Sequence, residues 1–177
     1  MMLPEILKAT MADVVELNKL VNSAYRGDSS RQGWTTEADI LDGTRIDEDI
    51  LKEVIQRPDT TVLLYKENQF LLGCVELRKD GQKIYLGMLS VMPNTQGKGV
   101  GKKLLKKAEE FAVEQGCTKI YMTVISVRTE LIDWYVRHGY DLTDERKPFK
   151  MPDIRFGIPK QELEFVVLEK IILPPNF

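Results

Sequence analysis

The chain has 177 residues, of which 43% are hydrophobic and 29% charged, a composition that predicts one globular domain over residues 1–177. A formal net charge of −2 argues against nucleic-acid binding and anionic membranes, and the apolar runs are too short to span a bilayer. Two cysteines and one histidine do not make a ligand set, so no metal is expected. Both cysteines lie in apolar contexts, and the acidic Glu5 comes before any long apolar stretch, which does not fit a signal peptide, so we expect a cytoplasmic protein.

The first half of the chain predicts one strand, two helices and then three strands. Thr10 is suited to cap the first helix, because apolar residues recur after it with helical spacing. Polar residues over 26–36 predict a loop, and Gly43 interrupts the second helix. The expected elements are a strand over 5–9, a helix from Thr10, a helix over 37–56, and strands over 61–65, 70–78 and 84–91.

The second half alternates helices and strands. Gly116 and Gly139 are natural helix ends, because glycine readily takes the left-handed conformation that closes a helix. The expected elements are a helix from Val100 to Gly116, a strand over 119–125, a helix over 129–138, a strand over 140–143, a loop over 148–159 and a strand over 163–172. The order is βααβββαβαββ, a mixed α/β pattern.

The most distinctive segment joins an apolar strand to a lysine-rich helix through a glycine-rich turn. The glycines let the backbone take positive φ and approach a ligand closely. Each lysine near the helix N-terminus costs about 0.3–1 kcal/mol, and an anion held by the first-turn amides would reverse that penalty. Alternatively, the lysines only face solvent. The glycines are Gly97, Gly99 and Gly101, and the lysines are Lys98, Lys102, Lys103, Lys106 and Lys107.

The spacing in this turn excludes two common phosphate loops. Gln96 stands where a Walker A loop has its first glycine, and Lys102 stands where a dinucleotide fingerprint has its third. Gln96-Gly-Lys-Gly-Val-Gly101, with its apolar lead-in over 89–93, instead resembles the Q/R-x-x-G-x-G/A pyrophosphate loop of the GNAT N-acetyltransferase superfamily. The resemblance implies a mixed, mostly antiparallel seven-stranded sheet, splayed at its centre and flanked by about four helices.

The same resemblance implies a binding site for acetyl-CoA as co-substrate. Loop amides would hold the pyrophosphate, and the backbone of the preceding strand would align the pantetheine arm. Arg128 replaces an asparagine that helps many members bind the cofactor; its guanidinium could meet a CoA phosphate or an acidic acceptor, or simply face solvent. The implied cofactor-binding residues are Leu89, Val91, Gln96, Gly97, Lys98, Gly99, Val100, Gly101, Lys102 and Arg128.

The segment 131–140 resembles the family signature aliphatic-x-x-Tyr-x-x-x-Gly-Phe/Tyr, which makes Tyr135 the candidate hydrogen-bond or proton donor to the departing thiolate. A tyrosine pKa of about 10 and a thiol pKa of about 8.5 make full proton transfer uphill by roughly 2 kcal/mol. A strong hydrogen bond is therefore a real alternative to proton donation. Tyr135 could also be a core tyrosine that only fills space between helix and sheet.

A general base is needed because only a neutral amine attacks a thioester. Glu76, on a predicted central strand, is the candidate carboxylate; the alternative is an outward-facing residue paired with Arg78 or Lys79. Tyr85 stands roughly where some members carry a catalytic glutamate, so that role is missing from its usual place.

The acceptor pocket carries the weakest sequence signal. The resemblance places it in two loops whose aromatic and charged residues suit a small polar acceptor, or only a packed surface. We expect transfer of an acetyl group to a primary amine, small molecule or peptide, in a ternary complex, and the family allows a homodimer. The rival interpretations are an inactive acyl-CoA-binding sensor and an ATP- or GTP-binding module. The candidate acceptor residues are Tyr25, Trp34, Glu37 and Phe156.

Overall fold

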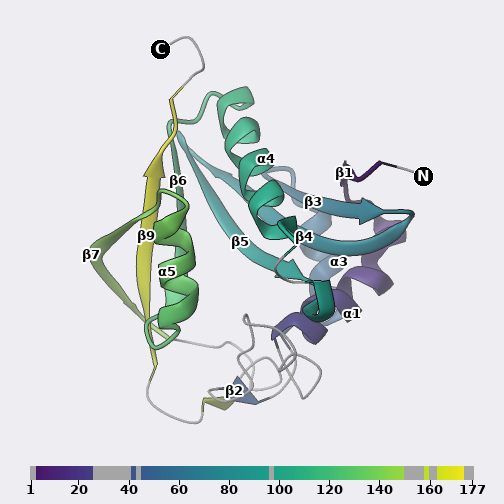
Figure 1. The fold of residues 1–177 in the computed structure, drawn as a ribbon, viewed down its shortest axis with the longest axis horizontal. Coiled ribbons are helices and arrows are strands. Elements are labelled where there is room, and N and C mark those ends of the chain that lie inside the picture. The colour runs from purple at the N-terminus through teal and green to yellow at the C-terminus, as the bar shows by residue number, and fades with distance from the viewer. Residues whose placement is uncertain are drawn as a thin grey trace.

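The structure is a computed structural model that describes residues 3–25, 41–42, 45–95, 98–149, 158–159 and 163–173. Its helices lie on both faces of one large twisted sheet (Figure 1). The strands are β1 (Glu5–Lys8), β2 (Leu41–Asp42), β3 (Thr60–Glu67), β4 (Phe70–Asp80), β5 (Lys83–Val91), β6 (Lys119–Ile125), β7 (Asp141–Pro148), β8 (Ile158–Pro159) and β9 (Glu164–Ile171). The helices are α1 (Val14–Tyr25), α3 (Glu48–Gln56), α4 (Val100–Glu114) and α5 (Thr129–Arg137), with 3-10 turns η1 (Met11–Asp13) and η2 (Pro93–Thr95).

Seven strands form the main sheet, in the order β1-β3-β4-β5-β6-β9-β7, and β2 pairs separately with β8. Only the β5–β6 pair in the main sheet is parallel; every other pairing is antiparallel. The described residues thus confirm the mixed, mostly antiparallel seven-stranded sheet with four helices.

Alternation along the strands builds a core on each side of the sheet. On β4, Val75 and Leu77 join the core beneath α4 and α5, whereas Cys74 points to the opposite side and joins the core beneath α1 and α3. All three side chains are fully buried. Because side chains alternate with a period of two, one strand serves both layers, which fixes the register of the central strands.

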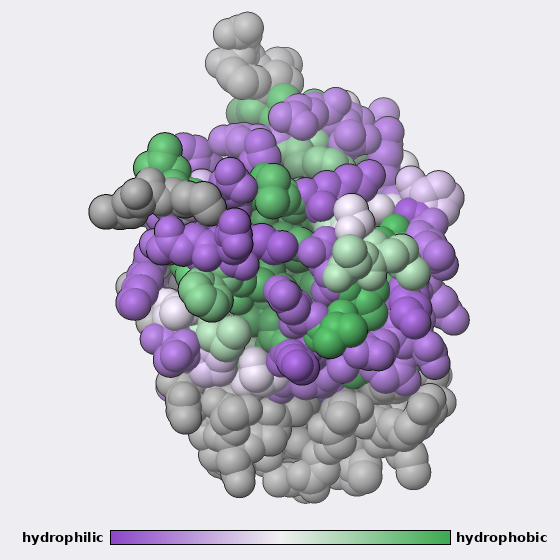
Figure 2. All heavy atoms as spheres, turned by 90° about the vertical axis from the view of Figure 1, so that its right-hand side faces the viewer, coloured by the Kyte–Doolittle hydropathy of each residue, from purple (hydrophilic) through white to green (hydrophobic). Residues whose placement is uncertain are grey.

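Both edges of the main sheet carry charge. β1 has only four residues, with Glu5 and Lys8 at its ends, and β7 is a largely exposed strand rich in charged residues that ends at Pro148. Seen onto the side that carries β1, the surface is mainly hydrophilic with smaller hydrophobic areas (Figure 2). Short, charged edges discourage strand addition by another chain. None of the described helices is long and apolar enough to cross a membrane.

Most of the expected elements are confirmed, and the clearest error concerns the second helix; residues 158–159 of the loop predicted over 148–159 also form a short strand, β8. The helix predicted over 37–56 begins only at Glu48, and residues 41–42 form a strand. Asp47 causes the late start: its backbone is extended, and its carboxylate accepts a hydrogen bond from the Ile50 amide at 2.9 Å. Residues 26–40 and 43–44 of the predicted loop and helix lie outside the described residues.

The strand β7 also differs from the prediction in length. The strand expected over 140–143 extends to Pro148, because β7 pairs with β9 from Asp141 to Pro148 across one register shift. The exposed, charged composition of this strand hides the alternation that identifies buried strands.

Candidate functional site

The N-terminus of α4 begins at a glycine in the left-handed conformation. Gly99 has φ 83° and ψ 9° and makes no side-chain cap. The first intrahelical hydrogen bond runs from the Lys103 amide to the Gly99 carbonyl at 3.0 Å. The amides of Val100, Gly101 and Lys102 precede it, so the helix geometry gives them no intrahelical acceptor. With the helix dipole, these amides favour an anionic group.

A groove of about 530 Å³ separates this end of α4 from α5. Gly101 lies within the helix, not at positive φ, and its role is close packing: a Cβ atom there would lie 3.3 Å from Cζ2 of Trp134. The Trp134 ring packs on His138 with a centroid distance of 4.3 Å, and Nδ1 of His138 lies 2.7 Å from the Trp134 carbonyl oxygen. The groove therefore has a main-chain wall from α4 and a wall of aromatic and charged side chains from α5 and its C-terminal end: Trp134, His138, Glu130, Asp133 and Arg137.

The parallel strands β5 and β6 part beside this groove. They pair only from Lys83 to Tyr85 on β5, although β5 continues to Val91. A cavity of about 160 Å³ occupies the gap, with lining residues from both strands, from α5 and from the end of α1. It brings together four residues that the sequence singles out: Tyr25, Leu89, Arg128 and Tyr135.

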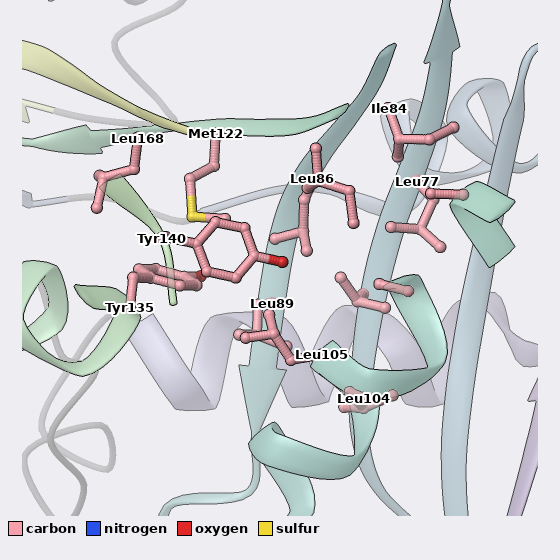
Figure 3. Packing of buried hydrophobic residues seen from close by; sticks show 14 of the residues in the cluster. Leu77, Ile84, Leu86, Leu89, Leu104, Leu105, Met122, Tyr135, Tyr140 and Leu168 are labelled. Atoms are coloured by element: carbon pink, nitrogen blue, oxygen red, sulfur yellow. The ribbon is translucent and has the colours of Figure 1, made fainter. Parts of the chain in front are cut away.

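Tyr135 reaches the cavity from the buried face of α5. Its side chain is 4% exposed and packs edge-on against Tyr140, at a centroid distance of 5.9 Å. Figure 3 shows the two rings close together in the core cluster that also holds Met122 of β6 and Leu89 of β5. Burial raises the pKa of Tyr135 well above 10, so its hydroxyl keeps its proton at neutral pH. Tyr135 is thus suited to donate a hydrogen bond and ill suited to give up its proton.

A bulge in β5 shapes the wall of the cavity. Cys74 and Glu76 on β4 pair with Ser90 and Gly87, so β5 holds one residue more than β4 between these pairs. The extra residue lies where Met88 takes a positive φ of 54°. The bulge bends β5 a few residues beyond Tyr85, the last residue of β5 that pairs with β6.

The backbone of β5 links the two hollows. Leu89 lines the cavity and Val91 lines the groove. The Leu89 carbonyl accepts a hydrogen bond from the Tyr25 hydroxyl, which fixes the end of α1 against β5. A ligand that followed β5 would pass from the N-terminus of α4 to Tyr135.

Glu76 lies on β4, directly opposite Gly87, which lines the cavity. Its carboxyl is half-buried, and no described residue forms an ion pair with it. Burial raises the pKa of Glu76 above 4.5, and the positive charges of Arg45 and Arg78 act in the opposite direction. The carboxylate is therefore a stronger base than an exposed glutamate.

Several predicted site residues lie outside the described part of the chain: Gln96, Gly97, Trp34, Glu37 and Phe156. Of the described cofactor candidates, Gly99, Val100, Gly101 and Lys102 line the groove with Val91, and Lys98 lies exposed just before Gly99. Arg128 lines the cavity between the strands, away from the N-terminus of α4.

Sequence reasoning missed two residues of the site. Trp134 forms a wall of the groove, and its place immediately before Tyr135 in a short helix is a signal that could have found it. Arg45 lines the cavity from the segment before α3. No periodicity or motif marks Arg45, because its position depends on packing between distant segments.

Comparison with known proteins identifies the family. The model of the acetyltransferase (GNAT) family matches residues 16–140, which include the groove, Tyr135 and most residues that line the cavity. The chain belongs to the GNAT acetyltransferase family. It is therefore an enzyme of a family of N-acetyltransferases, as the turn before α4 indicates.

Individual relatives resemble this GNAT protein over shorter stretches. Thialysine N-epsilon-acetyltransferase from Bos taurus is 35% identical over 65 residues, which are 36% of this chain and 38% of that protein. Streptothricin acetyltransferase from Streptomyces lavendulae is 32% identical over 59 residues, 33% of this chain and 31% of that protein. The region of this chain that matches thus spans only about a third of the length of each of these relatives.

Solved structures share the whole fold of this GNAT protein. An N-acetyltransferase from Staphylococcus aureus Mu50 superposes with a TM-score of 0.74 over 98% of this chain and 100% of its own, at 14% identity. The PaiA N-acetyltransferase from Thermoplasma acidophilum, solved in complex with coenzyme A, has a TM-score of 0.70 over 96% of this chain and 99% of its own, at 20% identity. At these identities the likeness is one of fold.

Proposed function

We propose that this GNAT enzyme transfers the acetyl group of acetyl-CoA directly to a primary amine in a ternary complex. The observation that carries the proposal is the parting of β5 and β6 beside the N-terminus of α4, which has no side-chain cap, with Tyr135 lining the gap. A relative in fold was solved with coenzyme A, which supports the same ligand here.

The groove between α4 and α5 would hold the cofactor end of the complex. The amides of Val100, Gly101 and Lys102 would bind the pyrophosphate, and Lys98 and Lys102 add positive charge at the same helix end. The pantetheine arm would follow β5 past Val91 to Leu89. This path places the thioester in the cavity, next to Tyr135.

In the transfer step, the neutral amine nitrogen attacks the thioester carbonyl carbon. A carbon–nitrogen bond forms, the carbon–sulfur bond breaks, and CoA leaves as a thiolate. We assign acceptance of the amine proton to Glu76, whose pKa burial raises. The Tyr135 hydroxyl would stabilise the thiolate by a hydrogen bond, because burial keeps the phenol protonated.

Replacing Tyr135 with phenylalanine tests this assignment. We expect Tyr135→Phe to lower turnover at least tenfold, about 1.4 kcal/mol of transition-state stabilisation, with little change in the acetyl-CoA dissociation constant. The assay is release of free thiol with a panel of amines, and calorimetry gives cofactor affinity. Tyr140→Phe is the matched control, since it removes a neighbouring buried hydroxyl that does not line the cavity.

Two outcomes would contradict the proposal. Undiminished turnover in Tyr135→Phe would remove Tyr135 from the reaction. Tight binding of acetyl-CoA by the unmodified protein, without thiol release for any amine, would instead indicate a sensor on the same fold.

A further inference from the structure

Positively charged side chains gather on the acceptor side of the cavity. Arg45 and Arg128 both line it, and both guanidinium groups lie over the ring of Tyr25, at 5.7 and 5.5 Å from the ring centroid. Arg78 stacks in the same way on Tyr85, which also lines the cavity, at 4.7 Å. Stacking on an aromatic face holds a guanidinium in place while leaving the donors at its edge available.

The position of Arg45 is fixed by its backbone. Its amide donates a hydrogen bond to Oδ1 of Asn22 on α1 at 2.6 Å, and Nδ2 of Asn22 donates to the carbonyl of Ile46 at 2.9 Å. The asparagine thus ties the segment before α3 to the last turns of α1. Arg45 is held at the cavity before any ligand arrives, which reduces the entropic cost of using it for binding.

No described carboxylate lies within ion-pair distance of the Arg45 guanidinium. The carboxyl of Glu76 lies in the field of three arginines, Arg45, Arg78 and Arg57, and of one further carboxylate, Asp59. The Arg45 guanidinium can therefore take the carboxylate of a ligand as its ion-pair partner.

The charge pattern selects among amine acceptors. A polycationic amine would meet repulsion from Arg45 and Arg128, whereas a carboxylate on the acceptor could form charge-assisted, bidentate hydrogen bonds with a guanidinium. The same cations lower the pKa of a nearby ammonium group, which raises the fraction of neutral amine that can attack. The cavity of about 160 Å³ is smaller than a drug-sized site and suits a small acceptor.

We propose that the acceptor is a free amino acid or similar small primary amine that carries a carboxylate, and that Arg45 binds this carboxylate beside Tyr25. The proposal rests on the acetyl transfer proposed above.

Matched pairs of acceptors test the proposal. Each amino acid is assayed for thiol release beside its decarboxylated amine and beside its amide, for example lysine, cadaverine and lysinamide. We expect kcat/KM to be at least tenfold higher for the carboxylate-bearing member. Arg45→Gln should reduce this ratio at least tenfold, and Arg146→Gln, which removes an exposed arginine from β7, should leave the ratio unchanged.

Binding of the same acceptors to the CoA-saturated protein separates this proposal from the proposed function. If no amine is acetylated, a dissociation constant at least tenfold lower for the amino acid still supports the carboxylate site. Equal or tighter binding of the decarboxylated amine, no binding of any pair, or an unchanged ratio in Arg45→Gln would overturn it. A preference for peptides over free amino acids would also overturn it.

Discussion

The hydroxyl of Tyr140 is buried and has no hydrogen-bond partner among the described residues. Its ring is 1% exposed, and its oxygen points towards Leu86 in the apolar core (Figure 3). An unpaired buried hydroxyl costs about 1–3 kcal/mol. We expect Tyr140→Phe to raise the free energy of unfolding by about 1 kcal/mol, measured by urea denaturation. A loss of stability would mean that this hydroxyl has a partner.

Glu76 gives a pH-dependent prediction for stability. Because burial raises its pKa above 4.5, the folded protein binds this proton more tightly than the unfolded chain does. Ionisation of Glu76 therefore lowers the free energy of unfolding progressively as the pH rises from 4.5 through the pKa of Glu76 in the folded protein. We expect the stability of Glu76→Gln relative to the unmodified protein to increase over this interval and then to level off.

Urea unfolding at a series of pH values measures this difference. If Glu76 is also the general base that accepts the amine proton, the fall of kcat/KM at acidic pH should disappear in Glu76→Gln. A stability difference that does not change with pH would show that Glu76 ionises as freely in the folded protein as in the unfolded chain.

A local motif lets the sequence single out an individual residue as a candidate. Tyr135 was identifiable because Ile132 precedes it by three residues and Gly139 follows it by four, the spacing of the family signature. Arg45 was not, because its place over the Tyr25 ring depends on Asn22 joining two segments that are distant in the sequence. Contacts of this kind leave no periodic signal.

At the scale of elements, the start of α4 carries the clearest consequence. Alanine at Gly99 would have to keep φ 83°, which costs an L-residue about 1–2 kcal/mol, and its methyl group would project into open space where we propose that the pyrophosphate binds. Gly81 has φ 62° and also faces open space, but it lies in the turn between β4 and β5. Gly81→Ala is therefore a matched control for backbone strain.

We expect both alanine variants to lose about 1–2 kcal/mol of unfolding free energy in urea denaturation. Only Gly99→Ala should also bind CoA more weakly. We expect its dissociation constant, measured by calorimetry, to be about tenfold higher, which is about 1.4 kcal/mol of binding free energy. Equal CoA affinity in the two variants would show that the first turn of α4 does not approach the cofactor.

Elements are predictable where one face is buried. The strands β3, β4 and β5 followed from strand-like apolar runs and from the turns between them. The start of α3 did not, since helical spacing continues upstream of Asp47 and the cap ends it through a single side-chain hydrogen bond. Periodicity shows that a helix exists, and capping decides where it begins.

At the scale of the whole molecule, the parting of the sheet divides the protein into two parts. Strands β1, β3, β4 and β5 lie on one side and β6, β9 and β7 on the other, joined at the short β5–β6 pairing (Figure 1). No periodicity in β5 or β6 predicts where they separate; family resemblance supplied that expectation. The two hollows of the site exist only because the separation occurs beside α4 and α5.

A crystal structure of this protein with acetyl-CoA tests the central claim most directly. We predict that the diphosphate oxygens lie within hydrogen-bond distance of the amides of Val100, Gly101 and Lys102, and that the thioester sulfur lies next to the Tyr135 hydroxyl. Acetyl-CoA bound away from the N-terminus of α4, or with its thioester outside the gap between β5 and β6, would contradict the account.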